Sequence, residues 1–152
     1  MRRGDAVLRV DFYHLTAAPL ERVLPSICEK LLAGGERLLL VAEAEHLQRL
    51  DTLLWTYAGD SFLPHARREA PNPEAQPILL TDTPEPLNSA TNIALADGRW
   101  RDEALGFART FYFFDAGALD RARATWRSLS KQPQVEPRYW KQDDRGRWFQ
   151  SA

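Results

Sequence analysis

Residues 37–42 read RLLLVA, and a little further on residues 50–65 read LDTLLWTYAGDSFLPH. The first run is short and almost continuously apolar, which is typical of a parallel strand buried on both faces of a sheet. A helical pattern then begins near Glu43 and carries apolar residues at i, i+3, i+7 and i+10, namely Leu47, Leu50, Leu54 and Tyr57. Gly59 is a natural residue to end that helix. A buried strand followed by an amphipathic helix predicts an α/β fold.

The same alternation of strand and helix extends in both directions along the chain. Upstream, the aromatic and β-branched run 7–15 predicts a strand, and a helical stripe follows it over 20–32. Downstream, we predict strands at 77–82, 92–96 and 110–114, and helices around 100–109 and over 116–131. Parallel strands need crossovers, so we expect a single three-layer domain with a mainly parallel, about five-stranded Rossmann-like sheet flanked by helices.

Three segments fit neither pattern. Residues 66–76 and 83–90 are polar and contain two prolines each, so we predict surface loops inside one domain that spans 1–152. The C-terminal tail, 132–152, is rich in aromatic and basic residues. Within this tail, the stretch RYWKQDDRGRWFQ either forms a small hairpin about Asp143 to Gly146 or packs as extended chain.

Composition points to a globular cytoplasmic protein. Of 152 residues, 44% are apolar and 27% are charged, which favours a packed core over disorder. The net charge of −1 argues against a protein that coats nucleic acid, although it is compatible with a local basic patch. A single cysteine, Cys28, fits a reducing compartment. No apolar run approaches the roughly 18 residues of a membrane span, so we expect no membrane segment.

The patterns typical of nucleotide, metal and catalytic sites are missing. The first strand runs into HLTAAPLE without the glycine-rich turn that holds a pyrophosphate, and Gly34-Gly35 reads as a helix cap. The three histidines share no metal-ligand spacing, so we expect neither a metal nor a cofactor. Asp11 and Asp82, at strand ends, are the candidates for acid–base chemistry, but such aspartates more often cap turns. We therefore predict a protein without catalytic residues, with a nucleotide-using enzyme as an alternative.

One aromatic residue stands apart from the core stripe of the helix that begins near Glu43. Trp55 points more than about 100° away from the middle of that stripe. Phe62, Leu63 and Pro64 follow in what should be a loop. Two interpretations are open. Either these four residues form an exposed anchor patch for a partner, or another element covers Trp55 as ordinary core.

A second candidate site lies on the helix predicted over 116–131. Arg123 and Arg127 are four residues apart and share a face, Arg121 adds a further cation, and Trp126 borders them. An arginine row beside a ring can hold an acidic peptide that ends in an apolar residue, because the guanidinium fork grips carboxylates and the ring floors a pocket. The competing interpretation is a solvated basic face with Trp126 in the core.

Several segments together resemble a known family, the chi subunit of bacterial DNA polymerase III. They are FYHL at 12–15, GGERLLLVAEAE at 34–45, LDTLLWTYAGDSFLPH at 50–65 and PILLTD at 77–82, followed by the basic helix and the aromatic tail. Their order and spacing cover nearly the whole chain. The resemblance implies a non-catalytic accessory subunit of the polymerase III clamp loader, active in DNA replication.

The resemblance also implies partners. In that family a helix near the C-terminus carries an alanine–arginine pair and an aromatic residue three positions on, and it docks the acidic C-terminal tail of single-stranded DNA-binding protein. Ala122, Arg123 and Trp126 match this pattern, whereas Leu119 occupies a position that the family can fill with a basic residue. The segment around Trp55 matches the one that faces a small clamp-loader subunit called psi or a helicase, although Trp55 could instead belong to the tail site. We expect a monomer within a heteromeric assembly, reaching nucleic acid mainly through proteins.

The tail supports an alternative function of a different class. Four cations alternate there with four rings, namely Arg138, Lys141, Arg145 and Arg147 with Tyr139, Trp140, Trp148 and Phe149. This composition suits stacking on bases and contacts to phosphates, so direct single-stranded nucleic-acid binding is the alternative. The structural explanation is a segment held on the domain by its rings, which Asp143, Asp144 and the near-neutral charge favour.

Overall fold

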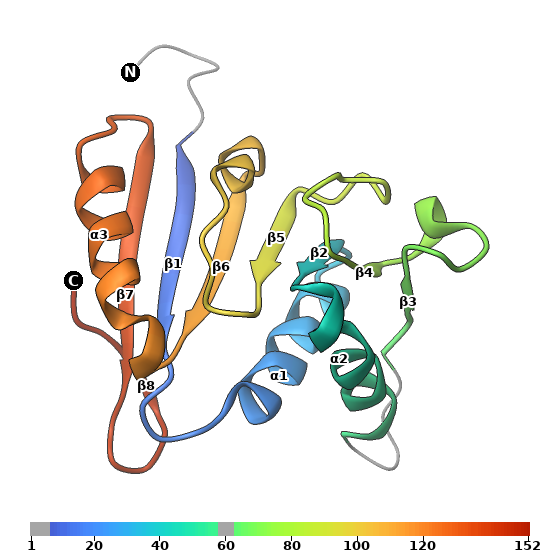
Figure 1. The fold of residues 1–152 in the computed structure, drawn as a ribbon, viewed down its shortest axis with the longest axis horizontal. Coiled ribbons are helices and arrows are strands. Elements are labelled where there is room, and N and C mark those ends of the chain that lie inside the picture. The colour runs from blue at the N-terminus through green and yellow to red at the C-terminus, as the bar shows by residue number, and fades with distance from the viewer. Residues whose placement is uncertain (1–6, 58–62) are drawn as a thin grey trace.

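A computed structural model gives the structure of residues 7–57 and 63–152, which fold around one sheet (Figure 1). The described residues contribute eight strands in the order β3-β4-β2-β5-β6-β1-β7-β8. The strands are β1 Leu8–His14, β2 Leu38–Val41, β3 His65–Arg67, β4 Ile78–Thr81, β5 Asn92–Leu95, β6 Arg109–Phe114, β7 Val135–Gln142 and β8 Trp148–Gln150. Neighbouring strands run parallel except β7 and β8, which are antiparallel.

Helices cover both faces of this sheet. The α-helices are α1 Leu20–Ala33, α2 Ala44–Thr56 and α3 Leu119–Ser130. Short 3-10 turns lie at η1 Pro73–Ala75, η2 Asp102–Gly106 and η3 Ala116–Ala118. The apolar cluster on one face contains residues of α1 and α2, and the cluster on the other face contains residues of α3 and η2. The α/β class with a mainly parallel sheet is therefore confirmed, and the layers number three.

β2 explains why RLLLVA is apolar throughout. Its four residues are completely buried. Leu38 and Leu40 belong to the cluster under α1 and α2, while Leu39 and Val41 belong to the cluster under α3. Successive side chains of a strand point to opposite faces, so a strand covered on both faces has no position left for a polar residue.

The five predicted strands correspond to β1, β2, β4, β5 and β6, but the count of five is wrong because β3, β7 and β8 add three more. β3 covers only three residues, and two of them, Ala66 and Arg67, lie in the predicted loop 66–76. β7 reads VEPRYWKQ, where charges and Pro137 hide the strand pattern. Pro137 is tolerated because β8 pairs only with residues 140–142, which leaves Pro137 with a strand neighbour on one side.

The structure also tests the predicted hairpin and the predicted ends of the helices. The hairpin alternative for the tail is confirmed, since β7 and β8 are antiparallel. The helix cap at Gly34-Gly35 is confirmed too, with Gly35 at a φ of 73° and its N–H donating to the carbonyl of Leu32. The helix predicted around 100–109 is only the 3-10 turn η2, and the one predicted over 116–131 begins as 3-10 before α3. Gly59, expected to end α2, lies outside the described residues.

Candidate functional site

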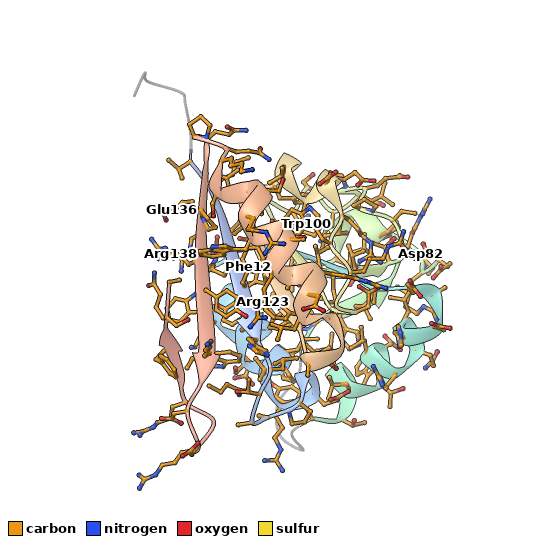
Figure 2. All side chains as sticks on the ribbon, turned by 60° about the vertical axis from the view of Figure 1, so that its left-hand side comes forward. Phe12, Asp82, Trp100, Arg123, Glu136 and Arg138 are labelled. Carbon is orange, nitrogen blue, oxygen red and sulfur yellow. The ribbon has the colours of Figure 1, made fainter. Side chains whose placement is uncertain are left out.

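α3 packs on the sheet through a narrow apolar stripe and leaves its cations in solvent. Ala122 and Leu129 are buried in the cluster between α3 and the sheet. Arg123 and Arg127 are exposed on the outer surface of the helix, and Figure 2 shows Arg123 on the side of α3 near Phe12. Trp126 is half-buried between these two environments. The spacing of the helix therefore places a ring at the boundary between core and solvent, with both arginines on its solvent flank.

The ring of Trp126 is held by other aromatic rings. It meets Phe12 of β1 edge-on, with ring centroids 5.2 Å apart, and Tyr139 of β7 edge-on at 5.7 Å. Phe12 and Tyr139 are themselves stacked at 6.2 Å. Trp126 is thus partly core and partly surface, and its role in holding an acidic peptide stays a prediction.

A pocket of about 250 Å³ opens between α3 and the end of β7. α3 contributes Arg123, Trp126 and Arg127. The other wall consists of Tyr139 and Lys141 of β7 with the following residues 151–152. Tyr139 exchanges backbone hydrogen bonds with that segment, because its carbonyl accepts from Ser151 N at 2.8 Å. The pocket therefore has an aromatic floor and three cations at its rim.

The titratable groups beside the pocket leave its positive charge in place. The Tyr139 hydroxyl lies 3.3 Å from Nδ1 of His14. Burial lowers the pKa of His14 below its ordinary value, and the charges of Lys141 and Arg123 lower it further, so this imidazole is neutral at pH 7. Burial raises the pKa of Tyr139, which keeps its phenol protonated. Among the side chains that line the pocket, those charged at neutral pH are the two arginines and the lysine.

The chemistry of this pocket fits an acidic peptide with an apolar residue. Guanidinium groups bind carboxylates with directional, charge-assisted hydrogen bonds. The exposed parts of Trp126 and Tyr139 offer apolar surface between those cations. Tyr139 and Lys141 were not predicted as members of this site. The alternation of cations and rings in the tail was the available signal, but only the pairing of β7 with β1 brings it beside α3.

Arg121, expected beside Arg123, does not line this pocket. It lines a crevice of about 650 Å³ at the carboxyl ends of β1, β5 and β6. Asp97 also lines this crevice, and both of its carboxylate oxygens bind the guanidinium of Arg101, at 2.8 and 2.9 Å. Burial raises the pKa of Asp97, but Arg101 and the backbone N–H groups of Glu43 and Arg99 outweigh it and lower the pKa below its ordinary value. Asp97 is thus held as a carboxylate that ties loops together.

The strand aspartates considered for acid–base chemistry are placed differently from each other. Asp11 is completely buried, accepts a hydrogen bond from Trp140 Nε1 at 2.9 Å, and lies 3.0 Å from Nε of both Arg9 and Arg109. Asp82 is exposed and directly follows the last residue of β4. The first carboxylate is fully engaged in ion pairs and the second has no buried environment, so neither has the surroundings of a general base.

The described part of the chain contains one group of possible metal ligands, Glu43, Glu45 and His46, whose ligand atoms lie within 4.8 Å of one another. The two carboxylates are exposed at the start of α2, an arrangement common on protein surfaces without a metal. Among the described residues, no helix is long and apolar enough to cross a membrane.

The three described residues of the predicted anchor patch differ in exposure. Trp55 is 52% exposed on the outer side of α2, so the interpretation that another element covers it is wrong. Its ring lies 4.7 Å from that of His65. Pro64 is half-buried, but Leu63 is 2% exposed and packs in the core under α1 and α2, so its expected exposure is wrong. Phe62 lies outside the described residues.

The tail rings that suggested base stacking are mostly engaged. Trp140 stacks on Tyr13 at 6.2 Å, and Trp148 meets the same ring edge-on at 5.1 Å. Both belong to the border of the core under α1. Phe149 is 46% exposed. Two of the four rings therefore clamp the hairpin onto the domain and do not present a free face to solvent.

Comparison with known proteins identifies the family of this chain. A family model described as DNA polymerase III chi subunit, HolC, matches residues 8–135 of the 152-residue chain. The chain belongs to the DNA polymerase III chi subunit family. The span matched by the chi family includes all of α2 and α3 and ends at the first residue of β7, so it contains one wall of the pocket and not the other.

One curated relative agrees with this assignment. It is the probable DNA polymerase III subunit chi of Rickettsia prowazekii (strain Madrid E), 26% identical over 86 residues. The match covers 56% of this chain and 52% of the relative, so the chain spans about half the length of the curated chi subunit that it matches.

Proposed function

We propose that this protein is a non-catalytic accessory subunit of the polymerase III clamp loader, which connects the replication machinery to DNA coated by single-stranded DNA-binding protein. The observation that carries the proposal is the pocket between α3 and β7, with Arg123, Arg127 and Lys141 around the rings of Trp126 and Tyr139. Its proposed ligand is the acidic C-terminal tail of single-stranded DNA-binding protein. Membership of the chi family supports this role, because the family is named as a polymerase III subunit.

In this proposal the two kinds of side chain have separate tasks. Arg123 and Arg127 bind carboxylates of the tail, and the apolar end of the tail packs against Trp126. A hydrogen bond to a charged group contributes roughly 1.5–3 kcal/mol. That energy corresponds to a change of about ten- to a hundredfold in the dissociation constant.

A second partner is proposed to bind the outer side of α2 through Trp55, together with Pro64. Phe62, which lies outside the described residues, stays a proposed member of this site. This partner is a psi-like clamp-loader subunit or a helicase. α2 and α3 belong to opposite faces of the sheet (Figure 1), so the two partners would not compete for space. An adaptor needs two separate sites of this kind. The protein would then be a monomer within a cytoplasmic heteromeric assembly.

Direct binding of single-stranded nucleic acid by the tail is less well supported. Base stacking needs open ring faces, and Trp140 and Trp148 are packed against Tyr13. The experiment that separates the two functions is a titration with two ligands. One is a synthetic peptide copying the acidic C-terminus of the host's single-stranded DNA-binding protein, and the other is a single-stranded oligonucleotide.

The expected result is micromolar binding of the peptide, which is lost when its final apolar residue is removed. Arg123→Ala should weaken binding by about ten- to a hundredfold. Arg22→Ala, an exposed arginine on α1, is the matched control and should leave the dissociation constant unchanged. Tight binding of the oligonucleotide without binding of the peptide would refute the proposal.

A further inference from the structure

Gln142, the last residue of β7, makes an unusual set of hydrogen bonds from a buried position. It is 8% exposed. Its amide oxygen accepts the backbone N–H groups of Thr16, Ala17 and Ala18 at 3.0, 3.0 and 3.1 Å. The Thr16 hydroxyl donates to the Gln142 carbonyl at 3.4 Å, and the Gln142 amide nitrogen donates to the carbonyl of Gly146 at 3.4 Å. This one side chain joins the β7–β8 hairpin to the loop between β1 and α1.

The loop that Gln142 fills is the one that binds phosphate in doubly wound sheets. There, backbone N–H groups between the first strand and its helix converge on an anion. Here the N–H groups of 16–18 converge in the same way, but their acceptor is a side chain from the other end of the chain. The donors of this loop are therefore used to hold the hairpin.

The hydrogen bonds of Gln142 begin where strand pairing ends. β7 pairs with β1 up to Trp140, opposite Tyr13, and β1 ends one residue later at His14. Lys141 and Gln142 have β8 on one side, but no residue of β1 pairs with them on the other. The position of this end of β7 relative to β1, and through β1 to α3, therefore depends on the contacts of Gln142.

We propose that Gln142 is a positioning residue for the pocket. It fixes the carboxyl end of β7 so that Lys141, the first residue beyond the pairing with β1, stands opposite Arg123 and Trp126 before an acidic peptide arrives. A wall held in place loses little conformational freedom on binding, which favours affinity. The inference rests on the proposed function of the pocket as an acidic-peptide site.

Three variants test this role. Gln142→Met keeps the length of the side chain and removes the acceptor of the three N–H groups. Gln142→Glu restores an oxygen acceptor, and measurement at about 0.3 M salt screens its added charge. Asn88→Leu is the matched control, because Asn88 is also a buried amide, donating to the carbonyls of Leu38 and Gln76 at 3.2 and 2.9 Å, and it does not line the pocket.

Each variant is measured by thermal unfolding, by amide hydrogen exchange and by titration with the acidic peptide. We expect Gln142→Met to speed exchange at 16–18 and at Lys141 about tenfold or more, and to weaken peptide binding about tenfold. Gln142→Glu should return both quantities to within about threefold of the wild type. Asn88→Leu should lower the melting temperature and leave the dissociation constant unchanged. If the role of Gln142 were purely structural, Gln142→Met would give the same result as this control.

Two results would overturn the inference. One is an unchanged dissociation constant in Gln142→Met although exchange at 16–18 is faster. The other is an equal loss of affinity in Asn88→Leu. If the wild type binds no peptide, the proposed function fails. The positioning role is then decided by amide exchange at Lys141, where unchanged protection in Gln142→Met rejects it. If Gln142→Met does not fold, Gln142→Asn, which is one CH₂ shorter, is measured in its place.

Discussion

The two tryptophans proposed to meet partners are held in different ways. Trp126 sits at the edge of the core, with the rings of Phe12 and Tyr139 against it and three cations lining the same pocket. Trp55 stands on the outer side of a helix, 52% exposed, with the ring of His65 as a neighbour. The first lines a pocket that is already formed in the structure, whereas the second is proposed as an anchor that a partner would cover. The difference predicts distinct energetics for the two sites.

The largest expected effect distinguishes the two rings by stability. Trp126→Ala should lower the free energy of unfolding by about 2–4 kcal/mol, because it removes a ring packed between β1 and β7. Trp55→Ala should cost less than about 1 kcal/mol. Denaturant unfolding of both variants measures the difference, and equal losses would remove the distinction drawn above.

The second largest expected difference between the two sites is the salt dependence of binding. Raising the salt concentration from about 0.05 to 0.3 M is expected to raise the dissociation constant of the acidic peptide about tenfold, because three cations line the pocket. Binding of a psi-like subunit or helicase at Trp55 should change by less than about twofold, since an indole anchor is mainly apolar. The same titrations at three salt concentrations test both expectations. A salt-independent peptide affinity would mean that the arginines do not contact its carboxylates.

Lys141 tests the wall of the pocket that lies outside the family match. Lys141→Ala should weaken binding of the acidic peptide about fivefold, because an exposed lysine contributes less to affinity than a buried ion pair does. Trp55→Ala serves as the control and should leave the peptide affinity unchanged. If Trp55→Ala also weakens the peptide, the tail reaches both tryptophans and the two sites are one.

The smallest expected effect comes from His14. Its pKa in the folded protein is below the ordinary value, so the stability associated with the neutral imidazole is present above about pH 6.5 and is lost as the pH falls through the folded pKa. An acidic peptide beside Lys141 and Arg123 offsets their charge and raises the pKa of His14. Binding therefore takes up protons and should tighten about twofold between pH 7.5 and 6. Calorimetry of the wild type and of His14→Asn at both pH values measures this, and the variant should lack the change.

Sequence patterns were sufficient to predict those elements whose two sides differ in polarity, or whose residues are all buried. β2 and α3 are of this kind, as every residue of β2 is buried and α3 buries only its apolar stripe. The place of β7 in the main sheet was missed because it comes from long-range pairing with β1, not from the strand's own pattern, which Pro137 interrupts. Half of the pocket was missed for the same reason.

Leu63 shows the opposite kind of failure. An apolar residue in a predicted loop suggested an exposed patch, but in the structure this side chain returns to the core under α1 and α2. His65 fixes that return, since its Nδ1 lies 2.6 Å from the Leu63 carbonyl and its Nε2 lies 3.1 Å from the Asp51 carboxylate. Local composition could not distinguish the two outcomes, because the direction of a loop is decided by its tertiary contacts.

The place of β1 in the sheet has a consequence for synthesis on the ribosome. β1 is made first, yet its two neighbours are β6, which begins at Arg109, and β7, which begins at Val135. At about 5–20 residues per second, the first strand waits on the order of ten seconds before both of its edges are covered. During that time an apolar, aromatic strand is available to chaperones and to other nascent chains. The pocket, which requires β7 beside β1, is among the last parts of the molecule to form, so an incomplete chain would not carry the site at which the finished subunit is proposed to act.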